Sequence, residues 1–327
     1  MAHPVNTVEQ APHPLPRVFL PFTADATDRM LKKEGRFAYY TTVETAVKIL
    51  RSREIWMRET SVMNDFTEID HGLHCMHFAY RSEAGKKFQA AINACFEGLT
   101  CEIEQLFDSW IPAIRTNTFA TCLSEHYTED DRYGRLSMWR AYGGNSGVAM
   151  IFNSAPMFRS SDVLGAYASP VAYFEKEALG NELSRVAQLI RNNISYATSL
   201  GRDGLKDTVF NILRFAIVST KHPAFEEERE WRVVSTIGVD ESEILKPHVE
   251  VIGGVAQRIL KIPLQDRPEG NLYGVELPQF LDRILVGPCA HSDAICEALQ
   301  LVLNEVGVLN AGLKIIDTQI PLRPNQR

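Results

Sequence analysis

Residues 221–234 constrain the fold most, because they carry acidic side chains into a stretch with the pattern of a β-strand. The pattern predicts a strand from residue 229 to about residue 238. Side chains alternate along a strand, so Trp231 would lie on one face and Glu228, Glu230 and Arg232 on the other. This charged face fits a solvent-exposed edge strand. It equally fits a cleft in which Arg232 keeps the carboxylates ionised, so that one of them binds a ribose hydroxyl or a developing cation. The spacing leaves both interpretations open.

Composition is that of a globular protein large enough to bury a substantial core: 45% of the 327 residues are hydrophobic. The net charge of -7 argues against binding nucleic acid through bulk charge, although a local basic cleft is still compatible with it. The six cysteines form no CxxC pair, which is typical of thiols in a reducing cytoplasm. Neither a signal-peptide pattern nor an apolar run of about 20 residues is present, so we predict a cytoplasmic protein without a membrane span.

The pattern of elements predicts a single α+β domain that follows an extended arm. Prolines indicate the arm over residues 1–35, with a short helix at residues 25–33. The domain then covers residues 36–327, with helical insertions near residues 83–112 and 176–219. Further strands are predicted at residues 37–41, 54–58, 119–125, 147–152, 163–174, 248–264, 281–287 and 314–320. Strands and helices do not alternate regularly, and dinucleotide, P-loop and nucleophile-elbow motifs are absent, which favours mixed or antiparallel sheets.

Three side chains beside a Gly-Gly turn are candidate nucleotide ligands. Trp139 and Tyr142 could stack on a base, and Arg140 could pair with a phosphate. The alternative for Trp139 is an aromatic anchor that holds the turn in place. Asn64 similarly fits either a helix cap or a ligand.

Three groups of residues together resemble a bacterial family catalogued as a domain of unknown function, number 2971. The resemblance extends over about residues 36 to 290, and its most specific part is Glu-x-Glu-Trp-Arg at residues 228–232. The matching stretches are residues 39–42, 55–57, 63–68, 119–125, 138–142, 147–149 and 221–232.

The order of these features is also similar to that of the ADP-ribosyltransferase fold. That resemblance implies a split sheet, NAD as the substrate and Glu230 as the catalytic glutamate, with Glu228 two residues before it. It also implies that Tyr40 and Thr41 hold the nicotinamide ribose and that Ser124 ends the middle strand. The first strand lacks the usual His or Arg, so Tyr39 or Tyr40 would substitute for it, Tyr40 stacking on nicotinamide while Arg140 holds the pyrophosphate.

The chemistry implied is cleavage of the nicotinamide glycosidic bond through an oxocarbenium-like sugar, which a carboxylate stabilises. The acceptor would be a protein, a nucleic acid or water, and many enzymes with this fold are toxins or defence effectors. No metal is expected for this reaction, and a homo-oligomer is compatible with it.

Two other functions compete with this interpretation. A metal-dependent hydrolase or nuclease would use Asp65, Glu68 and the histidines His71, His74 and His77, which are spaced three apart on a predicted helix. A non-catalytic nucleotide-sensing module would instead bind a nucleotide through Trp139, Arg140 and Arg232 without turning it over.

Overall fold

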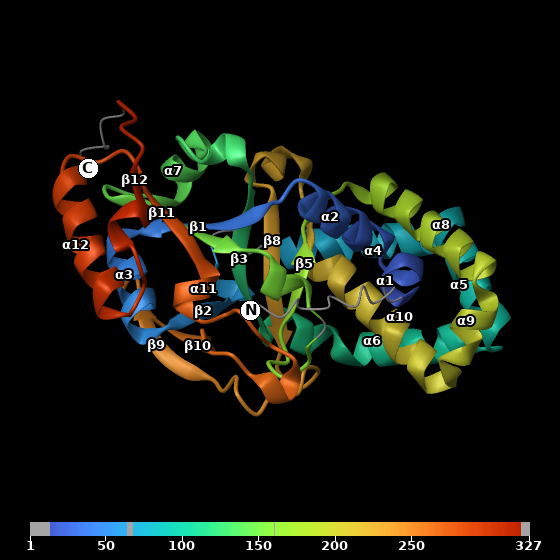
Figure 1. Cartoon of the computed structure of the whole chain (residues 1–327). Helices are drawn as coiled ribbons and strands as arrows, with labels where there is room; N and C mark the ends of the chain where they lie inside the picture. The colour runs from blue at the N-terminus through green and yellow to red at the C-terminus, as the bar shows by residue number, and fades with distance from the viewer. Residues whose placement is uncertain (1–13, 64–67, 160, 322–327) are drawn as a thin grey trace, which may run out of the picture.

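The computed structural model describes residues 14–63, 68–159 and 161–321 (Figure 1). The fold is α+β, as predicted, and within these residues ten strands form one sheet in the order β12-β11-β4-β1-β3-β2-β10-β9, with β8 pairing β3 and β5 pairing β8. All pairs in this sheet are antiparallel except β11 with β12. A parallel pair, β6 with β7, stands apart from it.

The strands lie close to the stretches that the sequence predicts. The ten of the large sheet are β1 Arg36–Thr42, β2 Glu54–Glu59, β3 Thr118–His126, β4 Gly147–Asn153, β5 Tyr167–Pro170, β8 Glu230–Thr236, β9 His248–Ile252, β10 Val255–Pro263, β11 Leu281–Val286 and β12 Ile315–Asp317. The small pair consists of β6 Ala172–Tyr173 and β7 Thr220–Lys221.

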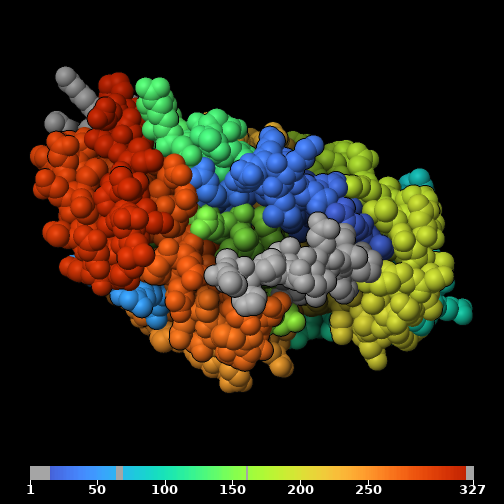
Figure 2. Space-filling model, viewed as in Figure 1, coloured from blue at the N-terminus to red at the C-terminus, as the bar shows by residue number. Residues whose placement is uncertain are grey.

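Helices gather at the two ends of the sheet, around separate apolar cores. At one end α3 and α12 pack on a core that includes Phe37, Phe152 and Trp231, and at the other end a layer built mainly of α4, α5, α6, α8 and α10 encloses its own core (Figures 1 and 2). None of the helices in the described part of the chain is both long and apolar enough to cross a membrane. The helices are α1 Pro14–Phe19, α2 Pro21–Lys32, α3 Val43–Ser52, α4 Glu68–Arg81, α5 Glu83–Cys95, α6 Leu99–Thr116, α7 Leu136–Tyr142, α8 Lys176–Asn192, α9 Ile194–Ser199, α10 Gly201–Val218, α11 Leu277–Phe280 and α12 Ser292–Glu305.

The predicted extended arm is helical in its described part. Helix α1 covers residues 14–19 and α2 covers residues 21–32, so the short helix predicted at residues 25–33 is part of α2, and residues 1–13 lie outside the described residues. Proline at the start of α2 is compatible with a helix because the first helical residues need no backbone donor. Val18 and Phe19 are buried in the core of the helical layer, so tertiary packing outweighs the proline-rich composition here.

Strand β3 is the point at which the sheet divides. One of its edges pairs with β1 as far as Ala38↔Ser124, and the same edge pairs with β2 only from Arg58↔Ala120 onward. Its other edge pairs with β8 along its length, from Thr118 to Ser124. Strands β1 and β2 therefore diverge from one edge of β3, and the segments that carry the acidic stretch lie along the other.

Gly72 allows α4 and α10 to touch through their backbones. A Cβ at this position would lie 2.1 Å from the Ile217 carbonyl oxygen, so we expect Gly72→Ala to lower the free energy of unfolding by at least about 2 kcal/mol. Gly204→Ala is a matched control in α10, because its nearest neighbour is 3.7 Å away. There alanine is expected to stabilise the helix by about 0.5 to 1 kcal/mol. Urea unfolding measures both changes, and equal effects would contradict the close helix contact.

Candidate functional site

Two acidic and two basic side chains form one buried group at the start of β8, which we call the β8 cluster: Lys221, Glu228, Glu230 and Arg232. The Lys221 Nζ lies 2.7 Å from Glu228 Oε2 and 3.3 Å from Glu230 Oε2. Arg232 Nε lies 2.7 Å from Glu230 Oε1. The formal charges balance, which is what burial of four ionised groups requires.

Glu230 is the inner carboxylate, with only 6% of its side chain exposed. Burial alone would raise its pKa, but the charge and hydrogen bond of Arg232 and the charge of Lys221 outweigh burial and lower it to about 2. Glu230 is therefore ionised throughout the physiological range. Its backbone N–H donates to the Tyr173 hydroxyl over 2.7 Å, which fixes the start of the strand.

Glu228 is the outer carboxylate, and its side chain is 19% exposed. The Tyr142 hydroxyl approaches its Oε1 to 3.5 Å, and burial together with the charge of Glu228 raises the pKa of Tyr142. The Glu228 carbonyl oxygen accepts from the Ser124 hydroxyl over 2.8 Å and from Arg135 Nη2 over 3.0 Å. The residue is thus held at its backbone, while its carboxylate reaches the surface.

The sequence pattern predicted a strand from residue 229 and placed Glu228 on the same face as Glu230; the two carboxylates do share one side, but Glu228 is not in line with the strand. Glu228 ends the 3₁₀ helix η4, Pro223–Glu228, and the strand begins only at Glu230, because Arg229 takes a left-handed conformation with φ 44°. Lys221, to which the sequence gave no separate role, brings both carboxylates together from β7 despite this turn. The predicted alternation holds within β8, since Trp231 enters the opposite core.

Several predicted ligands are built into the frame around the cluster. The buried Trp139 ring contacts Tyr40 edge to face at 4.8 Å, and its Nε1 donates to the Tyr133 carbonyl over 2.8 Å. The Tyr40 hydroxyl accepts from the Arg135 backbone N–H over 2.9 Å. Trp139 therefore has the position of the aromatic anchor, the alternative that the sequence left open, and Ser124 is likewise occupied by its bond to Glu228.

The remaining predicted ligands are divided between two faces of the sheet. Tyr39 and Thr41 alternate with Tyr40 along β1, so they lie on the opposite face, and burial raises the pKa of Tyr39 to about 12. Arg140 and Tyr142 are exposed on α7, and the Tyr142 hydroxyl is the one that reaches the cluster. Asn64, like Asp65, lies outside the described residues.

The helix histidines do not converge. His71 contacts the Phe174 carbonyl oxygen at 3.0 Å, whereas His74 and His77 are exposed. Across the described ranges no three His, Cys, Asp or Glu side chains form a group that could hold a metal ion.

Comparison with known proteins adds one finding at this site. A family model described as "Protein of unknown function (DUF2971)" matches residues 138–233. The match runs from α7 through η4 and into β8, so it contains Arg140, Tyr142 and the whole β8 cluster, although it is shorter than the range of about residues 36 to 290 that the sequence suggested. No curated protein and no solved structure matches the chain.

Proposed function

We propose that the chain consumes NAD at the β8 cluster, as a transferase or glycohydrolase. The bond between nicotinamide and ribose C1′ breaks, nicotinamide leaves with the bonding electrons, and the acceptor or water bonds to C1′ and releases its proton. The observation that carries the proposal is that Lys221 binds two carboxylates at once. Glu228 reaches the surface, and Glu230 is buried behind it.

Glu228 is the carboxylate that we assign to the substrate ribose, because it is the more exposed of the two and its backbone is held by Ser124 and Arg135. A carboxylate held in place before the reaction stabilises a developing positive charge without reorganising. Glu230 is a positioning residue, because its charge draws Lys221 to the site where that lysine also holds Glu228. Arg140 on the exposed side of α7 is available for the pyrophosphate.

A second candidate is nucleotide binding without turnover. It is favoured by the ion pairs of the cluster, because Glu230 is already bonded to both Arg232 and Lys221. In this case Arg140 and Tyr142 bind the nucleotide and the cluster only supports them.

Nicotinamide release from NAD tests the proposal, with cell lysate supplied as a source of acceptor. We expect Glu228→Gln to reduce release by about 100-fold or more, the usual cost of losing one electrostatic contact to a transition state. Glu227→Gln is the matched control: its side chain is exposed in the same turn, so release should stay within about twofold of wild type. Circular dichroism checks that both variants fold.

Two results would overturn the proposal. One is a folded wild-type protein that releases no nicotinamide, in which case calorimetric binding of NAD would support the second candidate. The other is release that Glu228→Gln leaves unchanged.

A further inference from the structure

A second site lies at the end of the sheet where β1 begins and β4 ends. There an open pocket of about 680 Å³ is formed by residues from five separate segments, among them Arg36, Asn153, Arg159 and Tyr273. In Figure 2 the segment that follows β4, in light green, is recessed between the blue and orange segments. The volume falls within the range of about 300 to 1,000 Å³ that small-molecule sites occupy.

One wall of the pocket is a network of ion pairs whose charges balance. Arg36 contacts Asp131 at 2.8 Å and Asp282 at 2.6 Å, and Arg283 contacts the same two carboxylates at 3.1 and 2.7 Å. Burial alone would raise the pKa of Asp131, but hydrogen bonds with Arg36 and His126 outweigh burial and lower it. These two arginines are therefore neutralised by the protein, and they offer a polar wall rather than a free positive charge.

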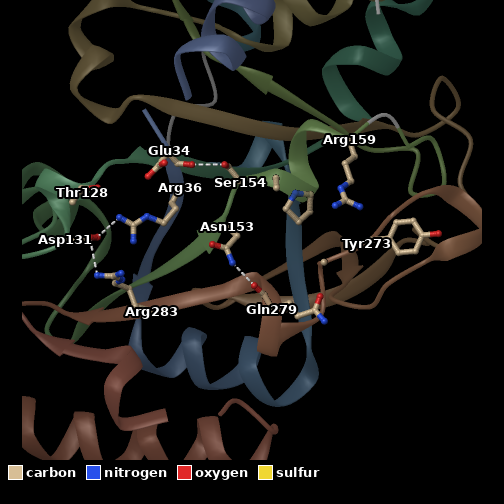
Figure 3. Close-up of a pocket in the computed structure, with 14 residues that line it drawn as sticks. Glu34, Arg36, Thr128, Asp131, Asn153, Ser154, Arg159, Tyr273, Gln279 and Arg283 are labelled. Carbon is tan, nitrogen blue, oxygen red and sulfur yellow. Dashed lines mark hydrogen bonds and ion pairs between the residues drawn. The ribbon is translucent and has the colours of Figure 1, made fainter. Parts of the chain in front are cut away.

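The opposite wall has a different character. Arg159 lies over the Tyr273 ring at 5.7 Å, and both side chains are exposed. Figure 3 shows this pair across the pocket from Arg36 and Arg283, with Asn153 and Gln279 between them. Among the residues that the structure describes, no carboxylate forms an ion pair with Arg159. This wall therefore combines an aromatic face with an uncompensated cation.

We propose that this pocket binds a nucleotide, with its base stacked on Tyr273 and its phosphate paired with Arg159. Aromatic rings accept any base through its π-face, and a guanidinium forms two parallel hydrogen bonds with a phosphate. The Asn153 Nδ2 already donates to the Gln279 carbonyl oxygen over 2.6 Å, so its side-chain oxygen is the group that can accept from a sugar hydroxyl. Glu34 on the far rim offers a second acceptor. The site does not depend on NAD cleavage at the β8 cluster, which uses other residues.

Calorimetry with AMP, adenosine and ribose 5-phosphate tests both halves of the proposal. We expect AMP to bind, Arg159→Ala to weaken AMP at least tenfold while leaving adenosine unchanged, and Tyr273→Ala to weaken both ligands that carry a base. Tyr273→Phe should retain AMP binding because the ring remains. Arg132→Ala is the matched control, since Arg132 lies over Tyr133 at 4.7 Å in a similar pair that does not line the pocket.

Three outcomes would overturn this assignment: no binding of AMP at millimolar concentration, AMP affinity that Arg159→Ala does not change, or ribose 5-phosphate binding as tightly as AMP. Glu228→Gln should leave AMP affinity unchanged. A loss of AMP binding in that variant would indicate that AMP binds at the β8 cluster, and it would overturn the assignment to the separate pocket.

Discussion

Arg232→Ala is expected to lower the free energy of unfolding by about 3 to 5 kcal/mol at pH 7, because it leaves Glu230 buried beside Lys221 alone. Removing one partner of a buried ion pair costs more than the pair contributes, since the remaining charge has lost water and is no longer fully compensated. Urea unfolding measures the change.

The pH dependence of this effect follows from the lowered pKa of Glu230. Its pKa is about 2 in the folded protein against an ordinary 4.5, so ionised Glu230 contributes stability that is complete above about pH 4.5 and is lost as the pH falls toward 2. The difference in free energy of unfolding between wild type and Arg232→Ala should therefore decrease over that acidic range. A protonated Glu230 carries no charge for Arg232 to compensate. Unfolding curves taken at intervals from pH 7 to pH 3 follow this change.

Two controls separate the cluster from ordinary surface charge. The Arg115–Asp70 pair, at 2.9 Å, is half-exposed on both sides, so Arg115→Ala should cost less than about 1 kcal/mol. The double variant Glu230→Gln with Arg232→Met should lose less stability than the two single variants added together, because neither charge is left alone. Additive losses, or an Arg232→Ala variant as stable as wild type, would contradict the coupled cluster.

Local sequence patterns predicted the strands of this fold well, because a strand with one buried face has apolar side chains at every second residue. In β8 the alternation of Trp231 with Glu230 and Arg232 is enough to assign one side chain to the core and two to the other face. The α+β class followed similarly from the irregular order of strands and helices. The helix predicted at residues 25–33 corresponds to most of α2, but the start of α2 and the whole of α1 were missed. Proline composition says nothing about the core on which Val18 and Phe19 pack.

The contacts that form the sites could not be predicted in this way. Lys221 contacts Glu228 and Glu230 on either side of the left-handed turn at Arg229, and a single backbone angle of this kind leaves no periodic signal in the sequence. Arg159 follows β4 and Tyr273 precedes β11, and the two residues, far apart in sequence, come together where these strands pair. Strand pairing of this kind depends on the whole sheet, which explains why no local motif indicated the pocket.

The role of Trp139 also depends on tertiary contacts that the sequence did not reveal. Its replacement has the second large expected effect on stability. Trp139→Ala should lower the free energy of unfolding by about 3 to 5 kcal/mol, because it empties a site closed by Tyr40 and removes the donor to the Tyr133 carbonyl. Gly287 confirms the tight fit, since a Cβ there would lie 2.7 Å from the indole ring. Urea unfolding of the alanine variant measures the loss.

Trp139→Phe keeps an aromatic ring in the site but removes the indole N–H and part of the ring volume. We expect a loss of about 1 to 3 kcal/mol, smaller than that of Trp139→Ala, because the Tyr133 carbonyl loses its donor while part of the ring packing remains. Trp110→Ala is the control at a half-buried ring and should cost less than Trp139→Ala. If Trp139→Ala were as stable as wild type but bound NAD or AMP far more weakly, the ring would be a stacking surface for the nucleotide. The buried position of Trp139, with its N–H already bonded, argues for the anchor.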